Sequence, residues 1–195
     1  MKTTRFLFLI GLLALLTNSG AALAQCSGTS VPNGFFEEMK SAPAQGGLVG
    51  DYLRCWQGSS PDVVITTDHP FAGPPSLGPW KVAMRGTNQG GDPIADSVIT
   101  TSWITVTPGK RYRLGGWLLR ANTADNVYLD FNDGRGQGGY FQDAQAMAAT
   151  TGVWEYRTAD VQVGPWTTAV QVRCVRDGAN RGNAYCDGVT LFPLN

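Results

Sequence analysis

Apolar and polar residues alternate in several short stretches of this chain. Within 126–133, Val127, Leu129 and Phe131 alternate with more polar residues, so one face of the segment is apolar. A repeat of two residues is typical of a β-strand with one buried face. Alternation or β-branched runs predict further strands at 62–68, 80–86, 97–121, 152–163, 168–177 and 184–192. The turn dipeptide Pro108-Gly109 divides the stretch 97–121 into two strands.

Helical spacing of apolar residues is rare after residue 24. The best exception, 143–151, predicts one helical turn or a loop. About eight or nine strands without intervening helices must pair mainly antiparallel, because parallel pairs need long crossover connections. We therefore expect an all-β fold, a two-sheet antiparallel β-sandwich of the jelly-roll type. The stretches 42–50 and 86–95 predict surface loops, and no repeat or linker divides 25–195, which is expected to form one domain.

The first 24 residues have the pattern of a secretory signal peptide. Lys2 and Arg5 precede an apolar run at 6–16, and the small residues Ala22 and Ala24 predict cleavage before Gln25. The apolar run is short for a membrane span, although a retained anchor is the alternative. We expect a secreted or periplasmic protein.

A second interpretation of this region is a lipoprotein signal. The sequence "LAQC" resembles a lipoprotein box that would place a lipid on Cys26, but Gln25 stands where Gly, Ala or Ser is usual. Lipidation would also leave an odd cysteine among Cys55, Cys174 and Cys186. Four cysteines can instead form two disulfides in an oxidising compartment, which argues against lipidation of Cys26.

Three disulfide connectivities are possible for four cysteines. If strands 168–176 and 184–192 form a hairpin, Cys174 and Cys186 lie directly opposite each other, within disulfide range. We therefore favour the pairs Cys174–Cys186 and Cys26–Cys55.

Charge gives little support for a nucleic-acid partner. The 195 residues include 15 basic and 15 acidic side chains; Lys2 and Arg5 lie in the predicted signal peptide, so 13 basic and 15 acidic residues remain. There is no basic stripe of the kind that binds phosphate backbones. Few charges with 25 Gly and 11 Pro are typical of a loop-rich extracellular β protein, which we expect to be a monomer.

Five segments in order give a family resemblance. They are "PNGFFEE" (32–38), "VTPGKRYRLGGWLLR" (106–120), "YLDFNDG" (128–134), "TGVWEYRT" (151–158) and "AYCDGVTL" (184–191). Together they resemble a CenC-like carbohydrate-binding module, which has the galactose-binding-like jelly-roll fold. The resemblance implies a carbohydrate partner.

The same resemblance implies a structural calcium ion. In such modules the ion lies between the N-terminal Asn-Gly-x-Phe-Glu segment and an aspartate of the final strand, here Glu37 and Asp187. Carboxylate and carbonyl oxygens are the ligands that calcium prefers. The family often has a second acidic residue where Gly188 stands. The alternative is that Asp187 faces solvent in an edge strand or caps a turn.

The alternation also predicts a binding face. With Tyr112, Leu114, Leu118, Leu129, Phe131, Val170, Val172 and Cys174 facing the core, the opposite positions would carry Arg113, Trp117, Tyr128, Asp130, Gln171 and Arg173. Flat aromatic rings with polar neighbours are suited to the apolar faces and hydroxyl rims of sugars. Tyr140, in loop 134–143, would overhang this surface. The alternative is that Trp117 is a core aromatic.

Catalysis has weaker support. The single histidine, His69, has no serine in a nucleophile elbow that it could activate as a general base. The cysteines are needed for disulfides. The carboxylate pairs Glu37–Asp187 and Asp130–Asp133 are not distinctive for a glycosidase. We expect a non-catalytic module that binds a glycan. The alternatives are a structural or protein-interaction sandwich, and a small glycan-active enzyme with a buried carboxylate of raised pKa in a cleft.

Overall fold

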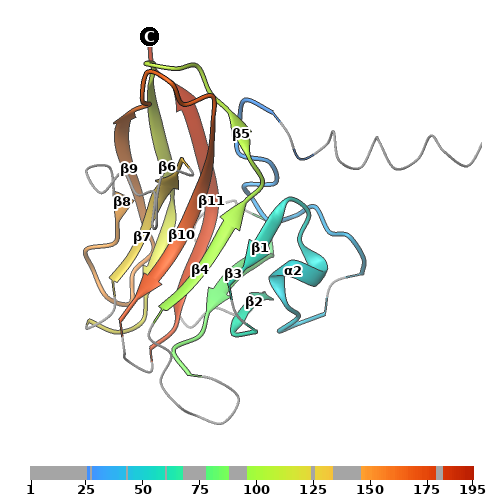
Figure 1. The fold of residues 1–195 in the computed structure, drawn as a ribbon. Coiled ribbons are helices and arrows are strands. Elements are labelled where there is room, and N and C mark those ends of the chain that lie inside the picture. The colour runs from blue at the N-terminus through green and yellow to red at the C-terminus, as the bar shows by residue number, and fades with distance from the viewer. Residues whose placement is uncertain are drawn as a thin grey trace, which may run out of the picture.

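The computed structural model describes most of the chain after the predicted signal peptide. The described residues are 26, 28–42, 44–59, 61–67, 78–87, 96–123, 126–133, 146–178 and 182–195. They form two antiparallel sheets that pack face to face (Figure 1). Within these ranges the structure contains no helix with the length and hydropathy that crossing a bilayer requires.

One sheet has six strands in the order β1-β4-β10-β7-β8, with β5 beside β10. Their bounds are β1 Trp56–Gly58, β4 Asp96–Thr101, β5 Ile104–Thr105, β7 Asn126–Asn132, β8 Ala146–Met147 and β10 Ala169–Asp177. Every pairing in this sheet is antiparallel.

The other sheet has five strands in the order β2-β3-β11-β6-β9. Their bounds are β2 Val63–Thr66, β3 Lys81–Met84, β6 Arg111–Arg120, β9 Glu155–Gln162 and β11 Ala184–Pro193. The short helix α2, Val49–Tyr52, precedes β1.

The core lies between the two sheets and is made by alternate strand positions. Leu114 and Leu118 of β6, Leu129 and Phe131 of β7, and Val172 of β10 are all fully buried in it. Tyr112, Val170 and Cys174 face the same core, as the alternation predicts. Burying each large side chain of this kind contributes about 1.5–3 kcal/mol. The all-β sandwich and the inward positions are therefore confirmed.

Short elements differ from the sequence-based expectation. Residues 146–147 of the segment 143–151 form strand β8, and α2 begins within the expected loop 42–50. The stretch 97–107 is interrupted between β4 and β5. Elements of two to four residues are too short for a periodic pattern to show.

Both predicted disulfides are present, but the predicted hairpin is wrong. The Cα–Cα distances are 5.2 Å for Cys26–Cys55 and 6.7 Å for Cys174–Cys186. Strand β10 pairs with β4 and β7, whereas β11 pairs with β3 and β6. The chain passes from one sheet to the other after β10, so the Cys174–Cys186 bond joins the two sheets across the core.

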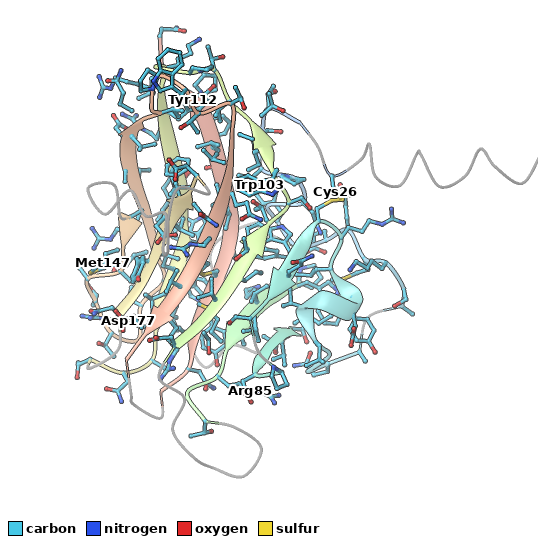
Figure 2. The ribbon with its side chains drawn as sticks, viewed as in Figure 1. Cys26, Arg85, Trp103, Tyr112, Met147 and Asp177 are labelled. Carbon is cyan, nitrogen blue, oxygen red and sulfur yellow. A yellow bond between two sulfur atoms is a disulfide. The ribbon has the colours of Figure 1, made fainter. Side chains whose placement is uncertain are left out.

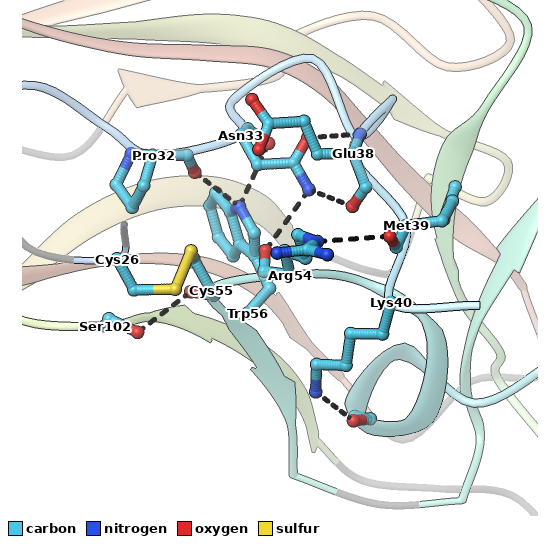
Figure 3. The surroundings of a disulfide bond; sticks show 11 residues. Cys26, Pro32, Asn33, Glu38, Met39, Lys40, Arg54, Cys55, Trp56 and Ser102 are labelled. Atoms are coloured by element: carbon cyan, nitrogen blue, oxygen red, sulfur yellow. Dashed lines mark hydrogen bonds between the residues drawn. A yellow bond between two sulfur atoms is a disulfide. The ribbon is translucent and has the colours of Figure 1, made fainter. Parts of the chain in front are cut away.

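The N-terminal segment is anchored beside the start of β1. The Asn33 side chain donates to the Glu38 and Arg54 carbonyls at 2.8 and 3.2 Å and accepts from the Glu38 N–H at 2.9 Å. The Trp56 indole donates to the Pro32 and Asn33 carbonyls, and the Cys26–Cys55 bond lies next to these contacts (Figure 3). The segment is therefore held firmly although it lies outside both sheets.

Candidate functional site

The outer face of the six-stranded sheet brings four of the predicted binding residues together. Tyr128 and Asp130 of β7, and Gln171 and Arg173 of β10, occupy the positions between the core-facing ones. Arg173 lies between Asp130 and Thr100 of the neighbouring strands. We call this surface the polar face, and define it by Gln57, Thr100, Tyr128, Asp130, Asn132, Gln171 and Arg173.

An ion pair lies at the centre of the polar face. The Arg173 guanidinium donates to both oxygens of Asp130, with Nε–Oδ1 at 2.8 Å and Nη2–Oδ2 at 2.5 Å. The Asp130 side chain is only 1% exposed and that of Arg173 11%. Burial raises the pKa of Asp130, and the hydrogen bonds and charge of Arg173 oppose this rise. The pair is thus fixed in orientation and carries no net charge.

A second set of hydrogen bonds fixes the neighbouring amides. The Asn132 amide donates to Gln171 Oε1 at 3.0 Å, and the Gln171 amide donates to the Thr101 carbonyl at 3.0 Å. Tyr128, which is partly exposed, lies between Val175 of β10 and the exposed Met147 of β8. An aromatic ring beside ordered amide and guanidinium groups can stack on one side of a sugar and hydrogen-bond its hydroxyls.

Trp117 and Arg113 do not lie on this surface. Both belong to β6 of the five-stranded sheet, and their side chains are on its outer face, because Leu114 and Leu118 point inward. Alternation predicts which side of a strand is polar, but it does not predict which sheet the strand joins. The residues expected on one binding surface therefore lie on two surfaces, one on each sheet. Tyr140 lies outside the described residues.

Trp117 and Arg113 each have a close partner on β9, which is Tyr156 for Trp117 and Asp160 for Arg113. Trp117 is half-buried, packs against a small outer cluster that includes Trp154 and Tyr185, and is not part of the main core. Arg113 donates two hydrogen bonds to Asp160, at 2.6 and 2.9 Å, on the exposed surface. These hydrogen bonds raise the pKa of Arg113 and lower that of Asp160.

Asp187 does not face solvent, so the alternative that it is a solvent-facing residue of an edge strand is wrong. Its side chain is fully buried; Oδ1 accepts from the Gly188 N–H at 2.7 Å, and Oδ2 has no hydrogen-bond partner among the described residues. Burial raises the pKa of Asp187 to about 7, with a further rise from Glu37, against opposing effects of the Gly188 N–H and Lys81. Gly188 has a φ of +56° at a β-bulge, a backbone conformation that favours glycine over an acidic residue.

The surroundings of Asp187 fit a hard cation in part. Glu37 Oε1 accepts from the Trp80 N–H at 3.0 Å, so this carboxylate is held nearby, and oxygens of this kind suit calcium. The ammonium of buried Lys81 lies 3.9 Å from Asp187 Oδ2 and donates to the Gly78 carbonyl at 3.4 Å. A positive charge therefore already stands among these oxygens. The part of the chain that the structure describes has no group of three or more metal-ligating side chains.

Sequence reasoning missed Asn132 and Lys81. Asn132 follows Tyr128 and Asp130 at a spacing of two, so the alternation could have placed it on the polar face. Lys81 gave no such signal, because a lysine at the start of a strand is ordinarily solvent-exposed.

Comparisons with known proteins support the fold. No protein-family model matches the sequence, and no curated protein matches it. Solved structures are similar at low identity. The CBM22-1 xylan-binding domain of Paenibacillus barcinonensis Xyn10C has a TM-score of 0.51 at 11% identity over 83% of this chain and 92% of that one. A CBM4 structure has a TM-score of 0.50 at 14% identity, covering 83% and 98%.

The same fold occurs in proteins of other kinds. The Stig cyclase Fisc from Fischerella sp. TAU, in complex with (3Z)-3-(1-methyl-2-pyrrolidinylidene)-3H-indole, has a TM-score of 0.58 at 11% identity over 85% of this chain and 98% of that one. The chain spans only 19% of the enzymatically active domain of bacteriophage CBA120 tailspike protein 4, with a TM-score of 0.50 at 16% identity over 72% of this chain. These similarities show the fold, a β-sandwich of the jelly-roll type that several carbohydrate-binding modules share.

Proposed function

We propose that this protein is a non-catalytic carbohydrate-binding module of the CenC-like kind that binds a glycan on its polar face. The observation that carries the proposal is the grouping of Tyr128, Asp130, Gln171 and Arg173 on two adjacent strands. The carbohydrate-binding modules among the structural neighbours agree with it. The two disulfides support an extracellular or periplasmic location.

The proposed binding relies on groups that are ordered before the ligand arrives. Asp130 holds the Arg173 guanidinium, and Asn132 holds the Gln171 amide, so little side-chain entropy is lost on binding. The Tyr128 ring would stack on the apolar face of one sugar residue. We expect a dissociation constant on the order of micromolar to millimolar, because one aromatic ring and a few polar groups would make the contacts.

Within the polar face, the enzyme alternative has one observation in its favour. Asp130 is a buried carboxyl with a raised pKa, which is one requirement for a general acid. However, Arg173 binds both of its oxygens, so neither is available to donate a proton to a glycosidic oxygen. This arrangement favours binding over hydrolysis. Detection of reducing ends that the wild type releases and Asp130→Asn does not would reverse that conclusion.

The binding proposal is tested by titrating residues 25–195 of the protein with a panel of soluble oligosaccharides in a calorimeter. Tyr128→Ala and Gln171→Ala should each weaken binding about tenfold or more, since each removes a contact to the sugar. Gln162→Ala is a matched control, because Gln162 is an exposed glutamine on β9 of the other sheet. The proposal fails if no glycan binds, if Tyr128→Ala and Gln171→Ala both bind like the wild type, or if Gln162→Ala weakens binding equally.

We also propose that calcium binds at Glu37 and Asp187 in competition with the Lys81 ammonium. The buried Asp187 Oδ2 supports a cation here, and Lys81 already supplies one charge, so the wild type should bind calcium weakly. In Lys81→Met, calcium should raise the melting temperature more than in the wild type, because Asp187 would otherwise be buried without a cation. Melting curves with calcium and with a chelator measure this. A melting temperature unchanged by calcium in both proteins contradicts the proposal.

A further inference from the structure

We propose a second carbohydrate site, for a non-acidic sugar, on the outer face of the five-stranded sheet. It consists of the ring of Tyr156 beside Trp117 and an adjoining pocket between the N-terminal segment and β11. We call it the aromatic face, and define it by Phe35, Glu38, Trp117, Tyr156, Thr190 and Phe192. It goes beyond the function proposed above, because it lies on the opposite sheet and shares no residue with the polar face.

The Tyr156 ring is held as a platform along the surface of the sheet. Its backbone is on edge strand β9, and its hydroxyl lies 3.2 Å from Thr190 Oγ1 on β11, on the far side of β6. Because neighbouring strands lie about 4.8 Å apart, a side chain that crosses β6 in this way must lie along the sheet. Gly115 of β6 provides the space, since a Cβ atom there would come within 2.6 Å of the tyrosine oxygen.

Trp117 supports this platform from the side. It is the cross-strand partner of Tyr156, with ring centroids 5.5 Å apart in an edge-on arrangement. Tyr156 nevertheless remains 46% exposed. An exposed ring that is fixed at its hydroxyl and against a tryptophan can stack on a sugar without first being ordered.

A pocket of about 360 Å³ adjoins the platform at Thr190. Phe35 and Phe192 line it and are about half exposed, and Glu37 and Glu38 contribute the acidic part of its lining. The volume falls within the range of small-molecule sites. Platform and pocket therefore form one continuous surface of aromatic rings and hydrogen-bond acceptors.

The backbone of the N-terminal segment fixes the wall of the pocket. Asn33 and Phe36 have positive φ values of 49° and 58°, and Phe36 is fully buried against Trp56, which leaves Phe35 pointing outward. The Gly34 carbonyl accepts from the Val189 N–H at 2.8 Å, and a Cβ atom on Gly34 would lie 2.0 Å from the Val189 oxygen. Only glycine permits this approach, so the sequence Asn33-Gly34-Phe35-Phe36 builds the wall.

Charge decides the class of sugar. The described lining of the pocket contains two carboxylates and no Lys or Arg; the nearby Arg113 is bonded to Asp160, which also pairs with Arg111 at 3.5 Å. Carboxylates accept hydrogen bonds from sugar hydroxyls or an amino group, and they repel the carboxylate of a uronic acid. The site should therefore bind neutral or amino sugars and exclude acidic ones.

The experiment compares cellohexaose, a glucosamine hexamer and a galacturonate hexamer by calorimetry. The background is Tyr128→Ala combined with Gln171→Ala, which disables the polar face, so any site that persists there is separate from it. We expect one remaining site for cellohexaose or the glucosamine hexamer and none for the galacturonate hexamer. Adding Tyr156→Ala or Phe35→Ala should weaken that site about tenfold, and Tyr156→Phe should weaken it less.

The matched control is Trp103→Ala. Trp103 is also 46% exposed, but it lies at the β4–β5 connection beside the six-stranded sheet (Figure 2). It should leave the second site unchanged, and melting curves should confirm that every variant is folded. The proposal is overturned if the polar-face background binds none of the three sugars, or if the galacturonate hexamer binds as well as cellohexaose. It is also overturned if Tyr156→Ala and Phe35→Ala have no effect on binding, or if Trp103→Ala weakens binding as much as they do. Failure of the polar-face variants alone would instead count against the function proposed above.

Discussion

Two arginine–aspartate pairs have the same geometry but different burial. Arg173–Asp130 and Arg113–Asp160 are both joined by two hydrogen bonds. The Asp130 side chain is buried, however, whereas Asp160 is partly exposed and Arg113 is half-exposed. Removing one partner of a buried pair leaves a charge without compensation, whereas an exposed charge is resolvated by water. Comparing the two pairs therefore tests how burial changes the contribution of an arginine–aspartate pair to stability, because the interacting groups are the same.

Arg173→Ala should lower the free energy of unfolding by about 3–5 kcal/mol, because Asp130 would remain buried alone. Arg113→Ala should change the free energy of unfolding only slightly. Urea denaturation of both variants at neutral pH measures the difference. Equal destabilisation by the two substitutions would contradict the burial argument.

Glu155 should make the stability of the folded protein depend on pH in the acid range. Burial by itself raises the pKa of Glu155, but hydrogen bonds from Thr150, Arg157 and Ala149 reverse this and lower the pKa to about 2. The folded state thus favours the carboxylate more than the unfolded state does, so stability is full above pH 4.5 and decreases as the pH falls toward 2.

Glu155→Gln should remove part of this acid sensitivity, because the amide does not titrate. Urea midpoints of the wild type and the variant between pH 6 and pH 2 provide the measurement. If the two proteins lose stability in parallel over that range, Glu155 does not contribute to the acid sensitivity.

At the scale of elements, the Cys174–Cys186 bond connects the two sheets. It joins β10 to β11, which share no backbone pairing, and both cysteines are fully buried. Replacing both by alanine should cost about 2–4 kcal/mol, because the unfolded chain gains freedom. Chemical denaturation of Cys174→Ala/Cys186→Ala under oxidising conditions measures the loss. A stability equal to that of the wild type would contradict a structural role for the bond.

The elements also show what a sequence pattern can predict. The alternation in β6, β7 and β10 correctly placed Leu114, Leu129 and Val172 in the core. It gave no information on which strands share a sheet, because pairing depends on contacts between segments far apart in the chain. For that reason Trp117 was grouped with Tyr128, and the right disulfide followed from a hairpin that does not exist.

Less of the aromatic face and of the surroundings of Asp187 could be predicted from the sequence. The Tyr156 platform depends on a bond from β9 across β6 to Thr190 of β11, and the pocket wall depends on positive φ values at Asn33 and Phe36. Both are tertiary features. The burial of Asp187 beside Lys81 of β3 likewise depends on residues far apart in the chain, and not on any local pattern.

At the scale of the molecule, the two candidate faces lie on opposite sides of the sandwich. The polar face belongs to the six-stranded sheet and the aromatic face to the five-stranded sheet, with the whole core between them. A molecule with both sites could bind two glycan chains at once. The polar face is built on strands that pack into the core, and the aromatic face combines such strands with the anchored N-terminal segment, so we expect both faces to be ordered before a ligand binds.

The central claim is that sugar binds on the polar face, and backbone NMR tests it most directly. Spectra of the ¹⁵N-labelled protein, recorded with and without the oligosaccharide that binds best, report which amides change. We predict shifts at 128–132 of β7 and 171–175 of β10, in addition to any at the aromatic face. Shifts restricted to the five-stranded sheet, or no shifts with any glycan, would contradict the claim.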